Sequence, residues 1–99
     1  MAREKLRVGV LGAGRWAETA HIPGWQRDSR CEIVAICDVV ERRARGFAEQ
    51  FGIPLATDDW QEVMSRPDVD VIDVVTATPA HFELAWAALE AGKHVLCEK

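Results

Sequence analysis

The stretch RVGVLGAGRWA, residues 7–17, constrains the fold more than any other part of the chain. A short apolar run breaks at once into the loop Gly12, Ala13, Gly14, which is typical of a buried strand that turns into a helix. Gly12 permits the tight turn, Gly14 lets the backbone approach a pyrophosphate, and the small Ala17 lets the helix pack closely on the strand. Free amides at the helix N-terminus would face the phosphates. The stretch therefore predicts a GxGxxA phosphate-binding loop, although glycine pairs after strands also serve ordinary turns.

After this loop the sequence alternates predicted strands and helices. Residues 31–38, CEIVAICD, carry an apolar run without polar alternation, as expected of a strand covered on both faces. A helix is expected over residues 15–20, and Pro23 with Gly24 is expected to kink or interrupt it before Trp25. Further helices are predicted over residues 44–51, 60–64 and 79–91, and further strands over residues 55–57, 69–75 and 94–97. This pattern predicts an α/β fold, a doubly wound parallel sheet (Rossmann fold) of about five strands in the order 3-2-1-4-5, with helices on both faces.

Length and composition indicate one ordinary globular domain. The chain has 99 residues, of which 48% are hydrophobic and 28% are charged, and no apolar run approaches the roughly 20 residues that span a bilayer. The net charge of -4 offers no basic surface for nucleic acid or anionic membranes, so neither partner is expected. Cys31, Cys37 and Cys97 form no CxxC pair, which together with the lack of a signal-peptide pattern predicts reduced thiols in a cytoplasmic protein. His21 and His94 have no partners at ligand spacing, so no metal site is expected.

Asp38, at the end of the second predicted strand, is the candidate for recognition of a dinucleotide. In a doubly wound sheet the acid at this position lies beside the adenosine ribose and accepts hydrogen bonds from its hydroxyls. A 2′-phosphate would bring like charge against it, so NAD is expected rather than NADP. Arg42 and Arg43, just inside the next helix, are evidence for NADP because either could reach a 2′-phosphate, but they are also compatible with a solvated helix face.

Two polar residues and one apolar stripe lie at unusual places in the predicted elements. Asp73 falls inside a strongly apolar strand, and we interpret it as a structural carboxylate, either near the exposed end of the strand or bonded to a neighbouring loop. His81 is interpreted as a helix-end or hydrogen-bonding residue rather than an acid-base group. Phe82, Trp86 and Leu89 recur at helical spacing and would be left poorly covered, which predicts self-association into a homo-oligomer.

The sequence resembles the glucose-fructose oxidoreductase and inositol dehydrogenase (Gfo/Idh/MocA) family in four stretches that together cover nearly the whole chain. They are GAGRWA at residues 12–17, FAEQFGIP at 47–54, VDVIDVVTATPAH at 69–81 and ALEAGKHVLCEK at 88–99. The final EK matches the EKP motif of the family without its proline. Ala77 departs from the TPxxxH pattern, in which a proline is usual.

The resemblance implies a role for individual residues. Gly12, Gly14, Arg15 and Trp16 would line the pyrophosphate and the nicotinamide side, Asp38 the adenosine ribose, Thr76 the nucleotide crevice and Glu98 the nicotinamide ribose. For Trp16, packing beneath the loop is an equal alternative. Lys99 would be the active-site lysine, a proton-relay or orienting group beside the substrate hydroxyl. An ammonium there would stabilise a developing alkoxide, although in this chain alone Lys99 is also expected to be a solvated terminus.

Three interpretations of function follow. The first is that residues 1–99 are the dinucleotide-binding domain of an oxidoreductase that transfers hydride between a nicotinamide cofactor and a sugar, polyol or related hydroxy compound. On this interpretation the family's C-terminal substrate domain is lacking, and the chain alone is not expected to turn over. The second is a free-standing nucleotide-binding module without catalysis. The third is a methyltransferase, whose sheet also ends its second strand with an acid.

Overall fold

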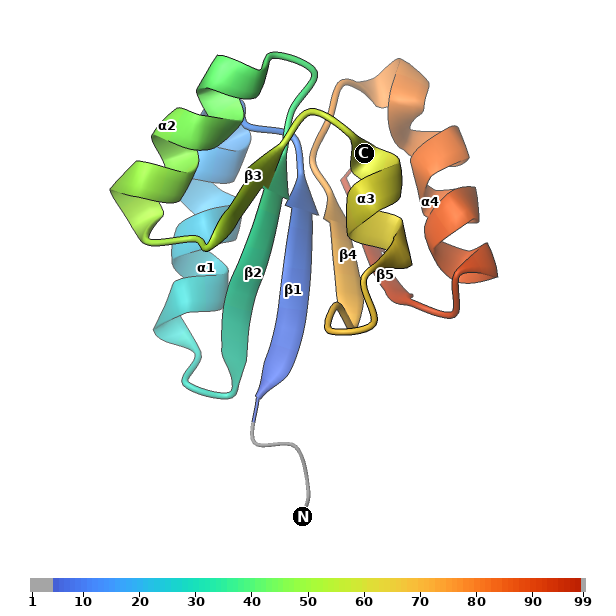
Figure 1. Ribbon diagram of the computed structural model, residues 1–99, viewed down its shortest axis with the longest axis horizontal. Helices are drawn as coiled ribbons and strands as arrows, with labels where there is room; N and C mark the ends of the chain where they lie inside the picture. Colours follow the sequence, from blue (N-terminus) through green and yellow to red (C-terminus); the bar gives the residue numbers. More distant parts are fainter. Residues whose placement is uncertain (1–4, 99) are drawn as a thin grey trace.

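The computed structural model describes residues 5–98, apart from the side chain of Thr78. Its centre is a five-stranded parallel sheet in the order β3-β2-β1-β4-β5 (Figure 1), which confirms the predicted strand order. The strands are β1 (Leu6–Leu11), β2 (Cys31–Cys37), β3 (Leu55–Thr57), β4 (Val71–Val74) and β5 (His94–Cys97). β2 ends one residue before its predicted limit, and β4 begins two residues later and ends one residue earlier than predicted.

Helices cover both faces of the sheet, as predicted (Figure 1). Alternate residues of each strand point to opposite faces, and the buried side chains accordingly form two separate cores. One core lies under η1 (Ala17–His21), α1 (Ile22–Arg27) and α2 (Glu41–Phe51). The other lies under α3 (Trp60–Ser65), η2 (Thr78–Ala80) and α4 (His81–Glu90). This two-layer covering explains why β1 and β2 read as continuous apolar runs.

Gly9 allows α3 to approach the middle of β1. A Cβ atom at this position would lie 2.6 Å from Cγ1 of Val63, which is closer than real carbon contacts. The same residue follows a shift in the register between β1 and β2, at Val8/Gly9. The close approach brings α3 beside the carboxyl ends of the central strands, where ligands bind in folds of this kind.

The first helix differs from its prediction. Helical backbone runs without a break from Arg15 to Arg27, so Pro23 and Gly24 do not interrupt it. The helix widens into the π turn η1 instead, in which the N–H of Ile22 donates to the carbonyl of Ala17. Proline has no N–H to donate. The wide turn, which ends two residues before Pro23, takes the place of the kink or interruption that we expected.

The ends of the other helices mostly follow their sequence signals. The side chain of Asp59 accepts a hydrogen bond from the N–H of Gln61 and caps α3. Gly52 ends α2 in the left-handed conformation, with a φ of 70°. The last helix starts later than predicted, because residues 78–80 form the 3-10 turn η2 and α4 begins only at His81.

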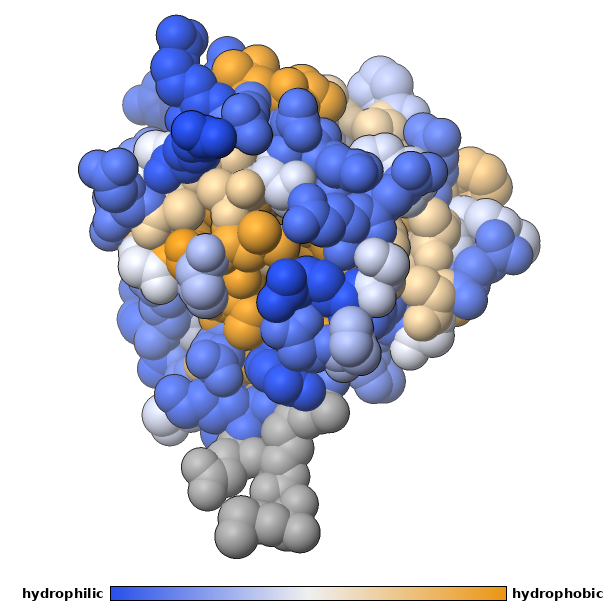
Figure 2. All heavy atoms as spheres, viewed as in Figure 1, coloured by the Kyte–Doolittle hydropathy of each residue, from blue (hydrophilic) through white to orange (hydrophobic). Residues whose placement is uncertain are grey.

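Parts of the surface remain apolar. Phe82, Trp86 and Leu89 on α4 are 78%, 55% and 59% exposed, and the first two rings stack with centroids 6.1 Å apart. On the face drawn in Figure 2, hydrophobic atoms also gather over the strands between α2 and α3, in a surface that is otherwise largely hydrophilic. No helix in the described part of the chain combines the length and apolar character needed to cross a membrane.

Candidate cofactor site

The glycine loop after β1 has the geometry that its sequence predicts. Gly12 has a φ of +118°, and a Cβ atom there would lie 2.8 Å from the backbone carbon of Val75, so only glycine fits. Its N–H donates a 2.7 Å hydrogen bond to the carbonyl of Cys37 at the end of β2. At Gly14, by contrast, no described atom beyond the adjacent residues of the chain lies within 4 Å of the position that a Cβ would take. The loop is therefore tightly held at its first glycine and open at its second.

Asp38 joins this loop to the end of β2. Its Oδ1 atom accepts a 2.9 Å hydrogen bond from the N–H of Ala13, and its Oδ2 atom accepts one of 2.9 Å from the N–H of Val40. Because β1 and β2 pair in parallel, the glycine loop after β1 and the residues after β2 lie at the same edge of the sheet. The carboxylate is half-buried and retains lone pairs toward the cavity that the two segments border.

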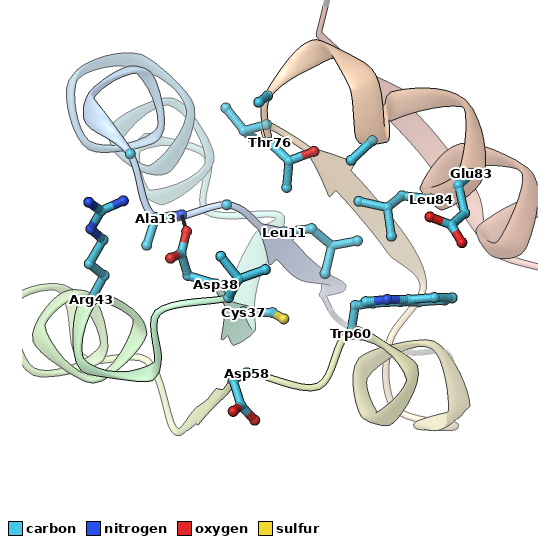
Figure 3. A pocket seen from close by; sticks show the side chains of 16 residues that line it. Leu11, Ala13, Cys37, Asp38, Arg43, Asp58, Trp60, Thr76, Glu83 and Leu84 are labelled. Atoms are coloured by element: carbon cyan, nitrogen blue, oxygen red, sulfur yellow. Dashed lines mark hydrogen bonds between the residues drawn. The ribbon is translucent and has the colours of Figure 1, made fainter.

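A cavity of about 470 Å³ opens at this edge, between the glycine loop, the end of β2 and the helices α3 and α4. Figure 3 shows Arg43 of α2 on one side, with Trp60 and Leu84 on the other. Six of the residues predicted from the sequence line the cavity: Gly12, Ala13, Gly14, Asp38, Arg43 and Thr76. Sequence reasoning missed Asp58, Trp60, Glu83 and Leu84, which also line it.

Thr76 contributes a buried hydroxyl to the cavity. Its Oγ1 atom is shielded from solvent and has no hydrogen-bond partner in the described part of the chain. Its carbonyl oxygen lies 2.6 Å from Nε2 of His81, which confirms the interpretation of His81 as a hydrogen-bonding residue. A buried hydroxyl without a partner is unfavourable unless a ligand supplies one. The cavity thus fits a polar ligand that reaches Thr76.

Among the described residues, Arg15, Trp16 and Glu98 do not line this cavity. Trp16 is 55% exposed, which excludes the alternative that it packs beneath the loop, and its Nε1 atom donates a 2.9 Å hydrogen bond to Oε2 of Glu98. Arg15 is exposed, and its carbonyl accepts a hydrogen bond from the hydroxyl of Thr19. Lys99, the predicted catalytic residue, lies outside the described residues.

Glu98 belongs to a second polar group that the sequence did not predict. His21 of η1 lies between two carboxylates, with Nδ1 2.8 Å from Oδ2 of Asp73 and Nε2 2.7 Å from Oε2 of Glu98. Trp25 also donates to Asp73, at 2.8 Å. Asp73 is fully buried in β4, so it does not lie near an exposed strand end as expected. Its partners His21 and Trp25 belong to the first helix and not to a neighbouring loop, which was the other expectation. Its position within an apolar strand was the one signal in the sequence.

Electrostatics at this second group favour a charged histidine. Burial alone lowers the pKa of His21, but the hydrogen bonds to Asp73 and Glu98 and the charges of both carboxylates raise it. The net effect is a pKa above 6.5.

The cysteines and acidic residues offer neither a nucleophile at the cavity nor a metal site among the described residues. Burial, together with nearby carboxylates, raises the pKa of Cys37 to about 12, so this thiol is not a nucleophile. All three cysteines are free. Within residues 5–98 no group of three or more His, Cys, Asp or Glu side chains is placed to hold a metal ion.

Comparison with known proteins supports a nucleotide site. A family model described as an oxidoreductase family with an NAD-binding Rossmann fold matches residues 6–99. The chain is 36% identical over 99 residues to D-glucoside 3-dehydrogenase of Escherichia coli, covering 100% of this chain and 28% of that protein. It is 38% identical over 94 residues to myo-inositol 2-dehydrogenase of Thermotoga maritima, covering 95% and 28%.

Solved structures agree with these relatives. An NAD-binding oxidoreductase from Klebsiella pneumoniae is similar with a TM-score of 0.91 at 32% identity, covering 98% of this chain and 28% of that chain. A 3-ketoreductase from Actinomadura kijaniata, in complex with NADP, has a TM-score of 0.90 at 35% identity, covering 96% and 30%. The chain therefore spans less than a third of the length of the relatives it matches.

Proposed function

The chain belongs to the Gfo/Idh/MocA oxidoreductase family, which has an NAD-binding Rossmann fold, and from this premise we propose that its 470 Å³ cavity binds the adenosine half of the dinucleotide. The observation that carries the proposal is the buried, unpartnered hydroxyl of Thr76 in a cavity that also holds the open glycine loop and Asp38. Such a cavity lies at the carboxyl ends of the strands, where the strand order reverses between β1 and β4.

The lining of the cavity suggests how the cofactor lies. Asp38 would accept hydrogen bonds from the adenosine ribose, and the open backbone at Gly14 would admit the pyrophosphate. Trp60 and Leu84 form an apolar wall on the α3 and α4 side, against which the adenine ring would pack. When bound, the nicotinamide ring would accept or give hydride.

We propose NAD rather than NADP as the preferred cofactor. The Asp38 carboxylate repels a 2′-phosphate, whereas Arg43, which also lines the cavity, would attract one. The related 3-ketoreductase from Actinomadura kijaniata was solved in complex with NADP, which is evidence for the phosphorylated cofactor. Titration calorimetry with NADH and NADPH decides between them, and a lower Kd for NADPH would contradict the proposal. Arg43→Gln should raise the Kd of NADPH more than the Kd of NADH. Arg42→Gln is a matched change at an exposed residue that does not line the cavity, and it should alter neither Kd.

On the nicotinamide side we propose Arg15, Trp16 and Glu98 as cofactor contacts and Lys99 as the group that handles the substrate proton. Support comes from the family resemblance and from the hydrogen bond that joins Trp16 to Glu98. The substrate would be a sugar, polyol or related hydroxy compound, because the matched relatives include D-glucoside 3-dehydrogenase and myo-inositol 2-dehydrogenase. Residues 1–99 would act as the dinucleotide-binding domain, and enclosure of the substrate would require a further domain.

A nucleotide-binding module without catalysis is the alternative to this enzyme, since the described cavity accounts for cofactor binding alone. Membership of an oxidoreductase family argues against the methyltransferase alternative. Binding of NADH by the chain supports both remaining interpretations, and hydride transfer to a keto sugar by the protein expressed from its native gene separates them. Failure of both NADH and NADPH to bind at millimolar concentration would overturn the proposal as a whole.

We also propose that the protein is a cytoplasmic homo-oligomer. Free thiols at Cys31, Cys37 and Cys97 are compatible with a reducing compartment. The exposed stripe of Phe82, Trp86 and Leu89 on α4 provides an apolar surface on which a second copy could pack.

A further inference from the structure

Asp73 is a buried carboxylate that binding of the adenosine half leaves unexplained. It is 0% exposed and pairs in the sheet with Val10 of β1 and Leu96 of β5. Its Oδ2 atom receives hydrogen bonds from Nε1 of Trp25 and from the ring of His21, each at 2.8 Å. A carboxylate held this deeply in an apolar sheet requires strong partners.

His21 connects this buried carboxylate to Glu98. The side chain of His21 is 10% exposed and that of Glu98 is 37% exposed, so the chain of contacts leads from the core to the surface. An ionised carboxylate only accepts hydrogen bonds, and therefore both ring nitrogens of His21 must donate when Asp73 and Glu98 are ionised. In this geometry the ring is an imidazolium between two carboxylates.

We propose that His21 is a positioning residue, which in its protonated form holds the Glu98 carboxylate toward the nicotinamide half of the bound dinucleotide. This inference rests on the proposed function, because it assumes that a dinucleotide crosses this edge of the sheet. The inference adds His21 to the residues that we propose on the nicotinamide side of the site. The buried Asp73 then holds the His21 ring in place through their hydrogen bond.

The topology places Glu98 on the correct side for this role. Asp38, after β2, marks the adenosine end, and a ligand that crosses between β1 and β4 extends toward β5. The N–H of Glu98 donates to the carbonyl of Val74, so the sheet fixes its backbone. Trp16, at the end of the glycine loop, donates to the same Glu98 oxygen as His21. The side chain is thus held between the loop and the histidine.

Loss of the proton from His21 should break its hydrogen bond to Glu98 and loosen the side chain, which Trp16 still contacts. A neutral imidazole has one donor, so its second nitrogen would present a lone pair to an ionised carboxylate. The contact with Glu98 should break rather than the one with Asp73, because the Asp73 side chain is fully buried whereas that of Glu98 is 37% exposed. Among the described residues, two further titratable groups lie close to this group of side chains. The thiol of Cys97 in β5 is near Asp73 and Glu98. Asp28, which is paired with Arg30, lines a separate cavity of about 400 Å³ together with His21, Trp25 and Leu96.

The test compares two ligands across pH with the full chain. Adenosine carries only the adenosine half and has no group that titrates in this range, so it should bind with the same Kd from pH 6 to 9. NADH also reaches Glu98, and its Kd should rise about tenfold as His21 loses its proton, the effect of one charge-assisted hydrogen bond. In Glu98→Gln the amide can donate to a neutral ring, so NADH should bind more weakly than to the wild type but without this pH dependence. His94→Gln, a matched change at an exposed histidine, should keep the wild-type profile.

The outcomes separate this inference from the proposed function. A constant ratio of NADH to adenosine affinity across pH, or an unchanged pH profile in Glu98→Gln, would overturn the role of His21 while leaving cofactor binding intact. Failure of adenosine and NADH to bind at any pH would overturn both. A histidine NMR titration gives a readout without ligand: the His21 ring should titrate above 6.5 in the wild type, and at lower pH in Asp73→Asn and in Glu98→Gln.

Discussion

The N–H of Ala13 donates a 2.9 Å hydrogen bond to Oδ1 of Asp38, so a residue of the glycine loop is held directly by the acid that follows the neighbouring strand. The other oxygen of the same carboxylate holds the N–H of Val40, at the start of α2. One side chain therefore fixes two backbone segments that border the cavity. The shape of the proposed phosphate site and recognition of the proposed ribose depend on the same residue.

Asp38→Ala should weaken both binding and folding. We expect NADH affinity to fall at least about tenfold, because hydrogen bonds to a charged group are lost, and stability to fall by about 1 kcal/mol as two N–H groups lose their acceptor. Calorimetry and urea unfolding measure the two effects. Asp38→Asn keeps an acceptor but removes the charge, and should bring the Kd values for NADPH and NADH closer together. Unchanged NADH binding in Asp38→Ala would show that the ribose assignment is wrong.

Gly12→Ala and Gly14→Ala should have different effects. At Gly12 the added methyl group meets the backbone of Val75 and Thr76 at a positive φ, so we expect a loss of about 2–4 kcal/mol in stability. At Gly14 nothing described blocks the methyl group, and stability should stay within about 0.5 kcal/mol of the wild type. NADH binding should nevertheless weaken in Gly14→Ala, because the methyl group occupies the space of the pyrophosphate. Full NADH affinity in that variant would contradict the proposed position of the phosphates.

Thr76→Val should separate binding from stability. The hydroxyl has no partner in the described protein, so its removal should leave the Tm unchanged or slightly higher, while NADH affinity falls about fivefold through the loss of one hydrogen bond. Thr57→Val is the matched control. The Thr57 hydroxyl donates to Glu62 and accepts from the N–H of Asp59, so this variant should lose about 1–3 kcal/mol in stability. A marked drop in the Tm of Thr76→Val would indicate a structural partner instead of a ligand.

The raised pKa of His21 predicts how stability depends on pH. Below pH 6.5 the ring is protonated in the folded and the unfolded chain, and its full contribution to stability is present. Above pH 6.5 the unfolded chain loses the proton first, so the free energy of unfolding should decrease as pH rises through the pKa of the folded state. Urea unfolding between pH 5.5 and 9 measures this decrease. Asp73→Asn should reduce the slope and His94→Gln should preserve it; equal slopes in wild type and Asp73→Asn would refute the assignment to His21.

Trp86→Glu should shift the chain toward the monomer. The ring is 55% exposed and stacks on Phe82, so a charge at this position disrupts the apolar stripe without entering the core. Sedimentation velocity over a range of concentrations should show association of the wild type and a smaller species for the variant. Leu6→Gln, at the opposite end of β1 from the site, serves as the control and should associate like the wild type. A monomeric wild type at high concentration would exclude the proposed homo-oligomer.

The features that the sequence predicts well are those set by local physical chemistry. Apolar runs without alternation predicted β1 and β2 as buried strands, and the connections between parallel strands then fixed the strand order. Gly12 could be assigned because a positive φ beside neighbouring backbone leaves no room for a side chain. The position of Asp38 beside the glycine loop could be predicted because the end of the second strand has a fixed place relative to the first loop.

The features that the sequence did not predict depend on contacts between distant segments. Trp60 and Glu83 line the cavity because α3 packs against β1 and β2 while α4 packs against β4 and β5. Neither residue carries a local signal of ligand binding. The partners of Asp73 lie 48 and 52 residues away in sequence. His21 and Trp25 reach Asp73 from the helix that contains the π turn η1. The sequence around Pro23 indicated only that this helix would be irregular.

That π turn also changes how the first helix tolerates insertion and deletion. A π turn is equivalent to an α-helix with one surplus residue, and one residue corresponds to about 100° of rotation around the helix axis. Deleting a residue between Ala17 and His21 could restore a regular helix and keep the polypeptide compact, yet it would change the direction of His21 relative to Asp73. Helix length in this segment therefore sets the orientation of the polar network, and alignments that close the extra position with a gap would misassign its residues.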